Sequence, residues 1–191
     1  TTEIVSIIPR EMADIVKADP GITRMPDGRP KFNGEILVLI SLLKRSTNEP
    51  SNIPVRGMDS VSMALRPSFR LVAGRLPNPG TSEIITGTSV SKNFVGCGIG
   101  ESVRFGMRDW TVVGIFEMGG GGFESEIWGN VEQLMDAFDR PVYSSLTLQV
   151  TSNAEFDALK RRLESDPRLT IDVLKEKEYY EKQSESFSLF I

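Results

Sequence analysis

The chain is organised around EILVLISLL, residues 35–43, which contains its longest apolar run. Gly34 precedes this stretch and the polar residues 46–52 follow it. Because several of its residues are β-branched, the run is typical of a buried strand rather than a helix. It is also far shorter than the roughly 20 apolar residues that a membrane-spanning helix needs. A second strand is expected over Ile53–Met58, where Pro54 keeps the preceding residue extended.

The segments before and after these two strands differ in character. Before them, Arg10–Ala18 has the apolar spacing of a short amphipathic helix, and Asp19-Pro20-Gly21 ends it. A strand near Ile22–Met25 is expected next, followed by a turn at Asp27-Gly28. After them, short strands separated by turn residues predict a compact, mainly antiparallel β unit. These strands are expected over Phe69–Ala73, Glu83–Thr86, Glu101–Phe105 and Trp110–Phe116, with a short helix capped by Thr88 over Thr88–Phe94.

The last third of the chain returns to alternating helices and strands. Asn130–Phe138 and Ala154–Ser165 each place apolar residues on one helical face, and Asn130 and Ser152 are suitable caps. Strands are expected over Ser145–Val150 and Leu169–Leu174, and a charged helix over Lys175–Ser186. The composition therefore changes twice along the chain, which predicts an α+β fold in which a β-rich segment interrupts an α/β layer.

The overall composition excludes several classes of function. The 191 residues carry a net charge of −4, which counts against a nucleic-acid partner. The chain has no histidine, the commonest general base and metal ligand. Cys97 is the single cysteine, so it cannot form an internal disulfide, and we expect it to be a small structural thiol. No catalytic, cofactor-binding or metal-binding residue is predicted.

Two local patterns in the chain bear on this exclusion. Ser89-Val90-Ser91-Lys92 has the spacing of the S-x-x-K nucleophile motif, but its usual partner motifs K-T-G and S-D-N are missing. Four acidic residues could in principle bind a hard cation, but they lack the spacing of a calcium loop and are expected to be solvated. They are Asp109, Glu117, Glu124 and Glu126.

The strongest candidate for a functional element is the glycine run. It consists of Gly119, Gly120, Gly121 and Gly122, and Phe123 follows it. One interpretation is a mobile loop that contacts a partner protein or a transported molecule, because four glycines give the backbone unusual freedom. The other is a loose connector whose aromatic neighbours, Phe123 and Trp128, fold back onto the β core.

Several short pieces, in a fixed order, resemble a known family. These pieces are Val55-Arg56-Gly57-Met58, Leu71-Val72-Ala73-Gly74-Arg75, Ser82-Glu83-Ile84-Ile85-Thr86-Gly87, Gly98-Ile99-Gly100-Glu101-Ser102-Val103 and Trp110-Thr111-Val112-Val113-Gly114-Ile115-Phe116. Their order and spacing, from about residue 15 to 184, resemble the periplasmic core domain of MacB/FtsX-like ABC transporter permeases.

The resemblance implies a division of the chain and a function. It implies an α/β, porter-like subdomain of residues 1–58 plus 144–191 and an inserted β-rich, sabre-like subdomain of residues 59–143. It implies a non-catalytic domain on the periplasmic side of the inner membrane that relays ATP-driven motion of membrane helices to export, substrate release or a partner protein. The implied partners are a cytoplasmic ATP-binding subunit, a second permease copy and periplasmic proteins. The apolar end, Phe187–Ile191, would begin a membrane helix.

Two other functions remain open from the sequence. A periplasmic ligand-binding module would need a deep apolar pocket. A hydrolase would need Ser89 as nucleophile with Lys92 beside it.

Overall fold

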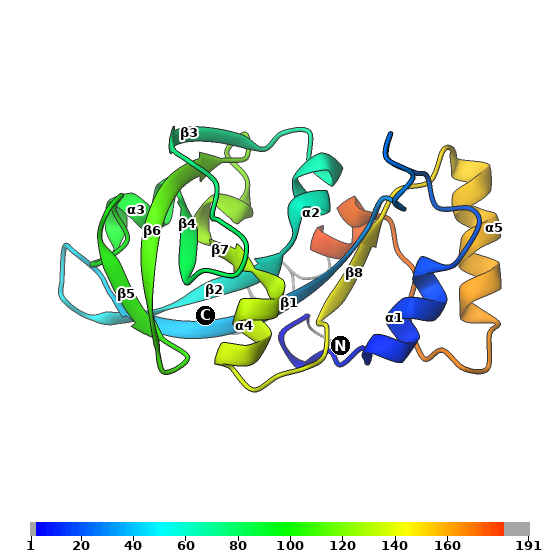
Figure 1. Ribbon diagram of the computed structural model, residues 1–191, viewed down its shortest axis with the longest axis horizontal. Coiled ribbons are helices and arrows are strands. Elements are labelled where there is room, and N and C mark those ends of the chain that lie inside the picture. Colours follow the sequence, from blue (N-terminus) through cyan, green and yellow to red (C-terminus); the bar gives the residue numbers. More distant parts are fainter. Residues whose placement is uncertain (1–2, 182–191) are drawn as a thin grey trace.

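The apolar run at residues 35–43 lies within β1 (Phe32–Leu43), which joins the two ends of the molecule in the computed structural model (Figure 1). The structure describes residues 3–181. Eight strands form one sheet in the order β3-β6-β4-β7-β2-β1-β8, with β5 also paired to β6. The pairs β2–β7 and β4–β6 are parallel, and the others are antiparallel.

The remaining elements follow the chain in regular alternation. The other strands are β2 (Pro50–Met58), β3 (Arg70–Gly74), β4 (Glu83–Gly87), β5 (Ser102–Phe105), β6 (Arg108–Glu117), β7 (Ile127–Asn130) and β8 (Ser145–Leu148). The helices are α1 (Arg10–Lys17), α2 (Ser60–Leu65), α3 (Thr88–Asn93), α4 (Val131–Ala137) and α5 (Asn153–Glu164), with 3-10 turns η1 (Glu3–Val5) and η2 (Gly122–Ser125). Residues 176–181 are also helical.

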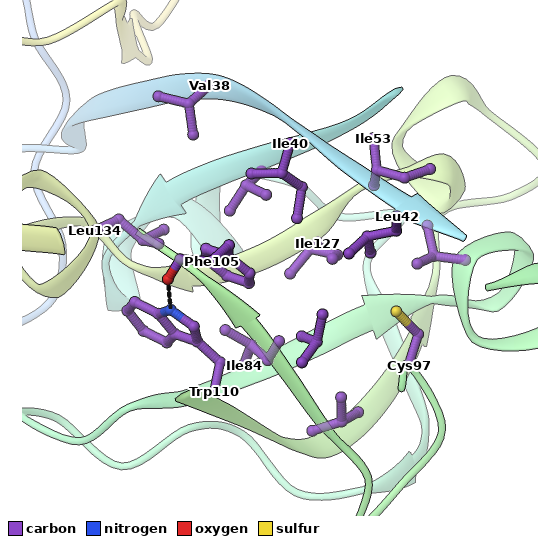
Figure 2. Close-up of a cluster of buried hydrophobic side chains, with 14 of the residues drawn as sticks. Val38, Ile40, Leu42, Ile53, Ile84, Cys97, Phe105, Trp110, Ile127 and Leu134 are labelled. Atoms are coloured by element: carbon purple, nitrogen blue, oxygen red, sulfur yellow. Dashed lines mark hydrogen bonds between the residues drawn. The ribbon is translucent and has the colours of Figure 1, made fainter. Parts of the chain in front are cut away.

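The main core lies on one face of the sheet. Alternate residues of β1 point into it together with side chains of β2, β4, β6 and β7, as expected from the period of two along a strand. Figure 2 shows Val38, Ile40 and Leu42 around the same space as Ile84 and Ile127. Trp110 is fully buried there, and its indole Nε1 donates a 3.1 Å hydrogen bond to the carbonyl of Phe105 (Figure 2).

A second core joins the two ends of the chain. Ala13 and Val16 of α1 pack with Leu159 and Leu163 of α5, and Phe32 at the start of β1 completes the cluster. In Figure 1 these helices lie at the opposite end of the molecule from the strands β3–β6. The strands β1 and β2 supply side chains to the main core, although the proposed division assigns them to the chain-end subdomain. That division remains a prediction.

Many of the predicted elements are confirmed. The α+β class is correct, and Asn130 and Ser152 cap α4 and α5 as expected, each accepting a hydrogen bond from a backbone N–H. The cap of α3 is Gly87 rather than Thr88, whose hydroxyl instead donates to Glu124. One α-helix and one strand of the described chain were missed: α2, which Asp59 caps, and β7. The 3-10 turns η1 and η2 were not predicted either.

Two predicted strands are wrong. Around Ile22–Met25 a single bridge joins Arg24 and Pro30, because the N–H groups of Thr23 and Arg29 are used elsewhere. The Thr23 N–H donates to the Gln149 carbonyl and the Arg29 N–H to the Asp27 carboxylate. Residues 169–174 also form no strand, because side chains of α5 take up the backbone groups instead. The Nζ of Lys160 donates to the Val173 carbonyl, and the Val173 N–H donates to Glu164. The charged helix begins at residue 176, and its predicted continuation to Ser186 lies outside the described residues, as does Phe187–Ile191.

The buried position of Leu134 gives a first test of the main core. We expect Leu134→Ala to lower the free energy of unfolding by about 2–5 kcal/mol, because the side chain is fully buried and the cavity left behind is apolar. Met107→Ala is the matched control. Met107 is 94% exposed, so its truncation should change stability by no more than about 0.5 kcal/mol. Urea unfolding of both variants measures this, and equal losses would contradict the core assignment.

Candidate functional site

A cluster of buried charges lies on the sheet face opposite the main core. We call it the arginine cluster; it consists of Arg56, Arg66, Glu3, Glu35 and Glu126, all of them buried. Glu35 and Arg56 lie on the paired strands β1 and β2, and Glu126 directly precedes β7. Because side chains alternate along β2, Arg56 points away from the core that Val55 enters.

Arg56 is the centre of the cluster. Its Nε and Nη2 each donate to a different carboxylate oxygen of Glu126, both at 2.8 Å, in the bidentate geometry that guanidinium groups favour. Its Nη1 donates to Glu3 at 2.5 Å and to Glu35 at 2.9 Å. All three nitrogens of this guanidinium are therefore paired, as a buried charge requires.

The carboxylates have further partners. Glu126 accepts from Trp128 Nε1 at 2.8 Å, Glu35 from Asn33 Nδ2 at 3.1 Å, and Glu3 from the hydroxyl of Ser145 at 2.7 Å. The cluster thus joins η1, β1, β2, β7 and β8 through polar contacts.

Arg66, just after α2, completes the cluster from another direction. Its Nη2 lies 2.7 Å from a carboxylate oxygen of Glu35, forming a buried ion pair. Its guanidinium carbon lies 5.3 Å from the ring centre of Phe123 and 5.9 Å from that of Trp128. Arg66 is therefore stabilised by one carboxylate and by two aromatic faces.

The cluster keeps Glu35 and its two arginines ionised. Burial raises the pKa of the Glu35 carboxyl, but the charges of Arg66 and Arg56 outweigh it and hold that pKa below its usual value. Burial lowers the pKa of Arg56, but the charge of Glu126 outweighs it and raises that pKa well above the usual value. The two arginines and three glutamates act as one ionic unit inside the fold.

The two ends of the described chain meet at this unit. Glu3 comes from the first turn, and Tyr179 and Tyr180 come from the last helical residues. The ring centres of the two tyrosines are 5.2 Å apart, and that of Tyr180 lies 4.9 Å from Phe123. Burial raises the pKa of both tyrosines, with the charge of Glu3 adding to the effect at Tyr179, so both hydroxyls keep their protons.

The predicted glycine loop lies beside the cluster. Residues 119–122 are exposed, and Gly119 and Gly120 have φ angles of 68° and 82°, which favour glycine. Phe123 folds back and contacts the side chains of Arg56, Arg66 and Trp128. The aromatic neighbours thus pack inward, while the role of residues 119–123 in contacting a partner remains a prediction.

The four acidic residues that were expected to be solvated differ in their partners and in their burial. Asp109 pairs with Arg104 on the surface, and Glu117 pairs with Arg70. Glu124 accepts hydrogen bonds from the backbone N–H groups of Met118 and Gly120. The expectation is wrong for Glu126, which is buried because it pairs with Arg56. Within residues 3–181 no group of acidic or cysteine side chains has the arrangement of a metal site.

The other candidate residues lie apart from the cluster. Ser89 and Lys92 are on α3, and no hydrogen bond among residues 3–181 joins their side chains. Cys97 is fully buried in the main core, and burial raises the pKa of its thiol to about 11, as suits a structural thiol. An apolar cavity of about 190 Å³ beside Met58, Met63 and Trp128 is smaller than the roughly 300–1,000 Å³ of most ligand pockets.

Sequence reasoning missed the arginine cluster. The available signal was a charged residue inside each of two apolar strands, Glu35 and Arg56, since such residues are rarely buried unless paired. Glu3 and Arg66 carry no comparable signal, because their partners are distant in sequence.

Removing Arg56 should be far more costly than removing an exposed arginine. We expect Arg56→Met to lower the free energy of unfolding by about 3–5 kcal/mol at neutral pH, because buried Glu126 loses its counter-ion and buried Glu35 keeps only Arg66. Arg104→Met is the control. Arg104 pairs with Asp109 on the surface, and the loss should stay below about 1 kcal/mol.

The difference between Arg56→Met and the wild type should also depend on pH. In the wild type, the stabilisation from the lowered pKa of Glu35 is complete at neutral pH and is lost as the pH falls below about 4.5. In the variant, Glu35 has lost one of the two charges that lower its pKa, so acid protonates it at a higher pH than in the wild type. The difference in unfolding free energy between the two proteins should therefore narrow from neutral pH to about pH 4. Urea unfolding across this range measures it, and a constant difference would contradict the ionic account.

The comparisons with known proteins agree with this architecture. Residues 11–166 match the family described as the MacB-like periplasmic core domain. No curated protein matches the chain by sequence. Every helix within residues 3–181 falls short of the length and apolar character needed to cross a membrane.

Three solved structures share the fold. The extracellular domain of YknZ, a noncanonic ABC-type transporter from Gram-positive bacteria, is similar with a TM-score of 0.63 at 18% identity, over 88% of this chain and 95% of that one. The periplasmic region of MacB from Actinobacillus actinomycetemcomitans has a TM-score of 0.61 at 13% identity, over 84% and 75%. A domain of a putative permease protein from Porphyromonas gingivalis has a TM-score of 0.56 at 13% identity, over 83% and 69%.

The family match, over residues 11–166, covers well over half of the chain, and the three structural matches each cover more than 80% of it. The chain belongs to the MacB-like periplasmic core domain family.

Proposed function

We propose that this domain is the extracytoplasmic part of a MacB/FtsX-like ABC transporter permease, where it relays motion of the membrane helices. The observation that carries the proposal is that both ends of the described chain converge on Arg56. Glu3 pairs directly with Arg56, and Tyr180 reaches the cluster through Phe123. In such a permease each chain end would continue into a membrane helix.

The arginine cluster suits the relay because it is buried and fully paired. A displacement of Glu3 would separate charges in a medium of low polarity, which is costly. Arg56 would therefore follow the displacement, and β2 would carry it into the centre of the sheet, between β1 and β7. The α/β ends, residues 1–58 plus 144–191, would receive the motion first, and residues 59–143 would deliver it.

The proposed partners follow from the family. ATP hydrolysis would take place in a cytoplasmic ATP-binding subunit or domain, and a second permease copy would face this one. The names of the similar structures, an ABC-type transporter and a permease, support a role in ATP-driven transport. The domain itself would carry no catalytic residue, and its output would be export or release of a substrate or a change in a periplasmic partner protein.

The location of the domain is the first property to test. In a Cys97→Ser background, Gly121→Cys places a thiol on an exposed loop, whereas Cys97 itself is buried. Intact cells that make the full-length protein are treated with a membrane-impermeant maleimide. We expect labelling without lysis, and retention of the protein in membranes after alkaline extraction. Labelling only after lysis, or release by alkali, would contradict an extracytoplasmic permease domain and favour another function.

A further inference from the structure

The glycine loop has a fixed base and an unpacked tip. At the base, Glu124 accepts from the N–H groups of Met118 and Gly120 at 2.9 and 2.7 Å, and from the Thr88 hydroxyl at 3.1 Å. The backbone of Glu124 lies so close to Gly87 that a Cβ there would be 2.1 Å from its carbonyl oxygen. At the tip, by contrast, an added Cβ at Gly119, Gly120 or Gly122 would meet no atom within 4 Å.

Phe123 joins this loop to two different parts of the chain. Three of its neighbours belong to the sheet or to the residue that follows α2. They are the guanidinium carbons of Arg56 and Arg66, each 5.3 Å from its ring centre, and the Trp128 ring at 5.8 Å. The fourth neighbour is Tyr180, whose ring meets Phe123 edge-on at 4.9 Å. Tyr180 comes from the end of the described chain and belongs to neither the sheet nor the loop.

We propose that the Tyr180–Phe123 contact is a latch, which makes the order of the Gly119–Gly122 loop depend on the position of the C-terminal helical segment. When Tyr180 stays in place, Phe123 is packed between the two arginines and the tyrosine ring. Because Phe123 is part of η2, this packing also holds η2 in position at the end of the loop. When the segment withdraws, Phe123 loses one side of its packing, and the exposed loop gains freedom. The inference deepens the proposed function, on which its use in transport rests, by naming the surface element that would respond to motion of the chain end.

The latch is a property of the chain and can be tested without a membrane. Amide hydrogen exchange at Gly120 and Glu124 reports on the loop, because Gly120 N–H is bonded to the Glu124 carboxylate and Glu124 N–H to the Gly121 carbonyl. We expect Tyr180→Ala to speed exchange at these two amides about two- to tenfold, the factor that loss of one aromatic pair implies. Amides of β4 should exchange as in the wild type.

Two control variants separate the latch from general damage. Tyr179→Ala removes the same side chain one residue earlier, where its ring contacts Tyr180 but not Phe123, and should change loop exchange less than twofold. Tyr180→Phe keeps the ring and should behave as the wild type. Unchanged loop exchange in Tyr180→Ala, or an equal rise in Tyr179→Ala, would overturn the latch.

A second variant covers the case in which Tyr180→Ala loosens the whole domain and β4 exchange rises too. Phe123→Leu removes the other ring of the pair and should raise loop exchange by a similar factor, and Tyr180→Ala should add little to it. Full additivity of the two changes would overturn the latch. Maleimide labelling only after lysis would overturn the permease function. It would not affect the latch, because the exchange rates are measured on the purified 191-residue chain.

Discussion

A single buried guanidinium organises one face of this domain. Arg56 cannot remain inside the fold without counter-ions, and it is bound by Glu3, Glu35 and Glu126 from three separate parts of the chain. The pairing with Glu3 fixes η1 against the sheet, and the pairing with Glu126 fixes the chain between the glycine loop and β7. Glu35 pairs with Arg66 as well, so Arg66 lies next to Arg56. Replacing such a cluster by apolar residues is often no loss in stability, so its presence here is better explained by the specific arrangement it imposes.

Local patterns were sufficient to predict much of the fold. The helices α1, α4 and α5 follow from apolar residues spaced along one helical face, and the caps of α4 and α5 follow from Asn130 and Ser152. The strand β1 follows from its apolar run. The wrong strand at residues 169–174 has a long-range cause, because Lys160 and Glu164 bind its backbone from α5. No local pattern reveals that competition.

The candidate site was predicted only in part. The glycine run was identified as a distinct surface element, and the alternative that Phe123 folds inward agrees with its contacts to Arg56 and Trp128. The arginine cluster was missed because its members lie far apart in sequence, and because Glu3, Arg66 and Glu126 each have an ordinary explanation as a surface charge. Glu126 shows the difficulty: it stands beside Glu124 in sequence, yet one is buried in an ion pair and the other caps a turn.

The strand β1 has a consequence for how the molecule can come apart. Its first residue, Phe32, belongs to the core between α1 and α5, and the alternate residues Ile36, Val38, Ile40 and Leu42 belong to the main core. Tyr143 also packs against both cores. Neither core is complete without β1. If one core unfolds and β1 is displaced, the other core therefore loses side chains that it buries. The domain is therefore built to unfold in a single cooperative step, and an excised fragment of residues 59–143 would retain an open apolar face.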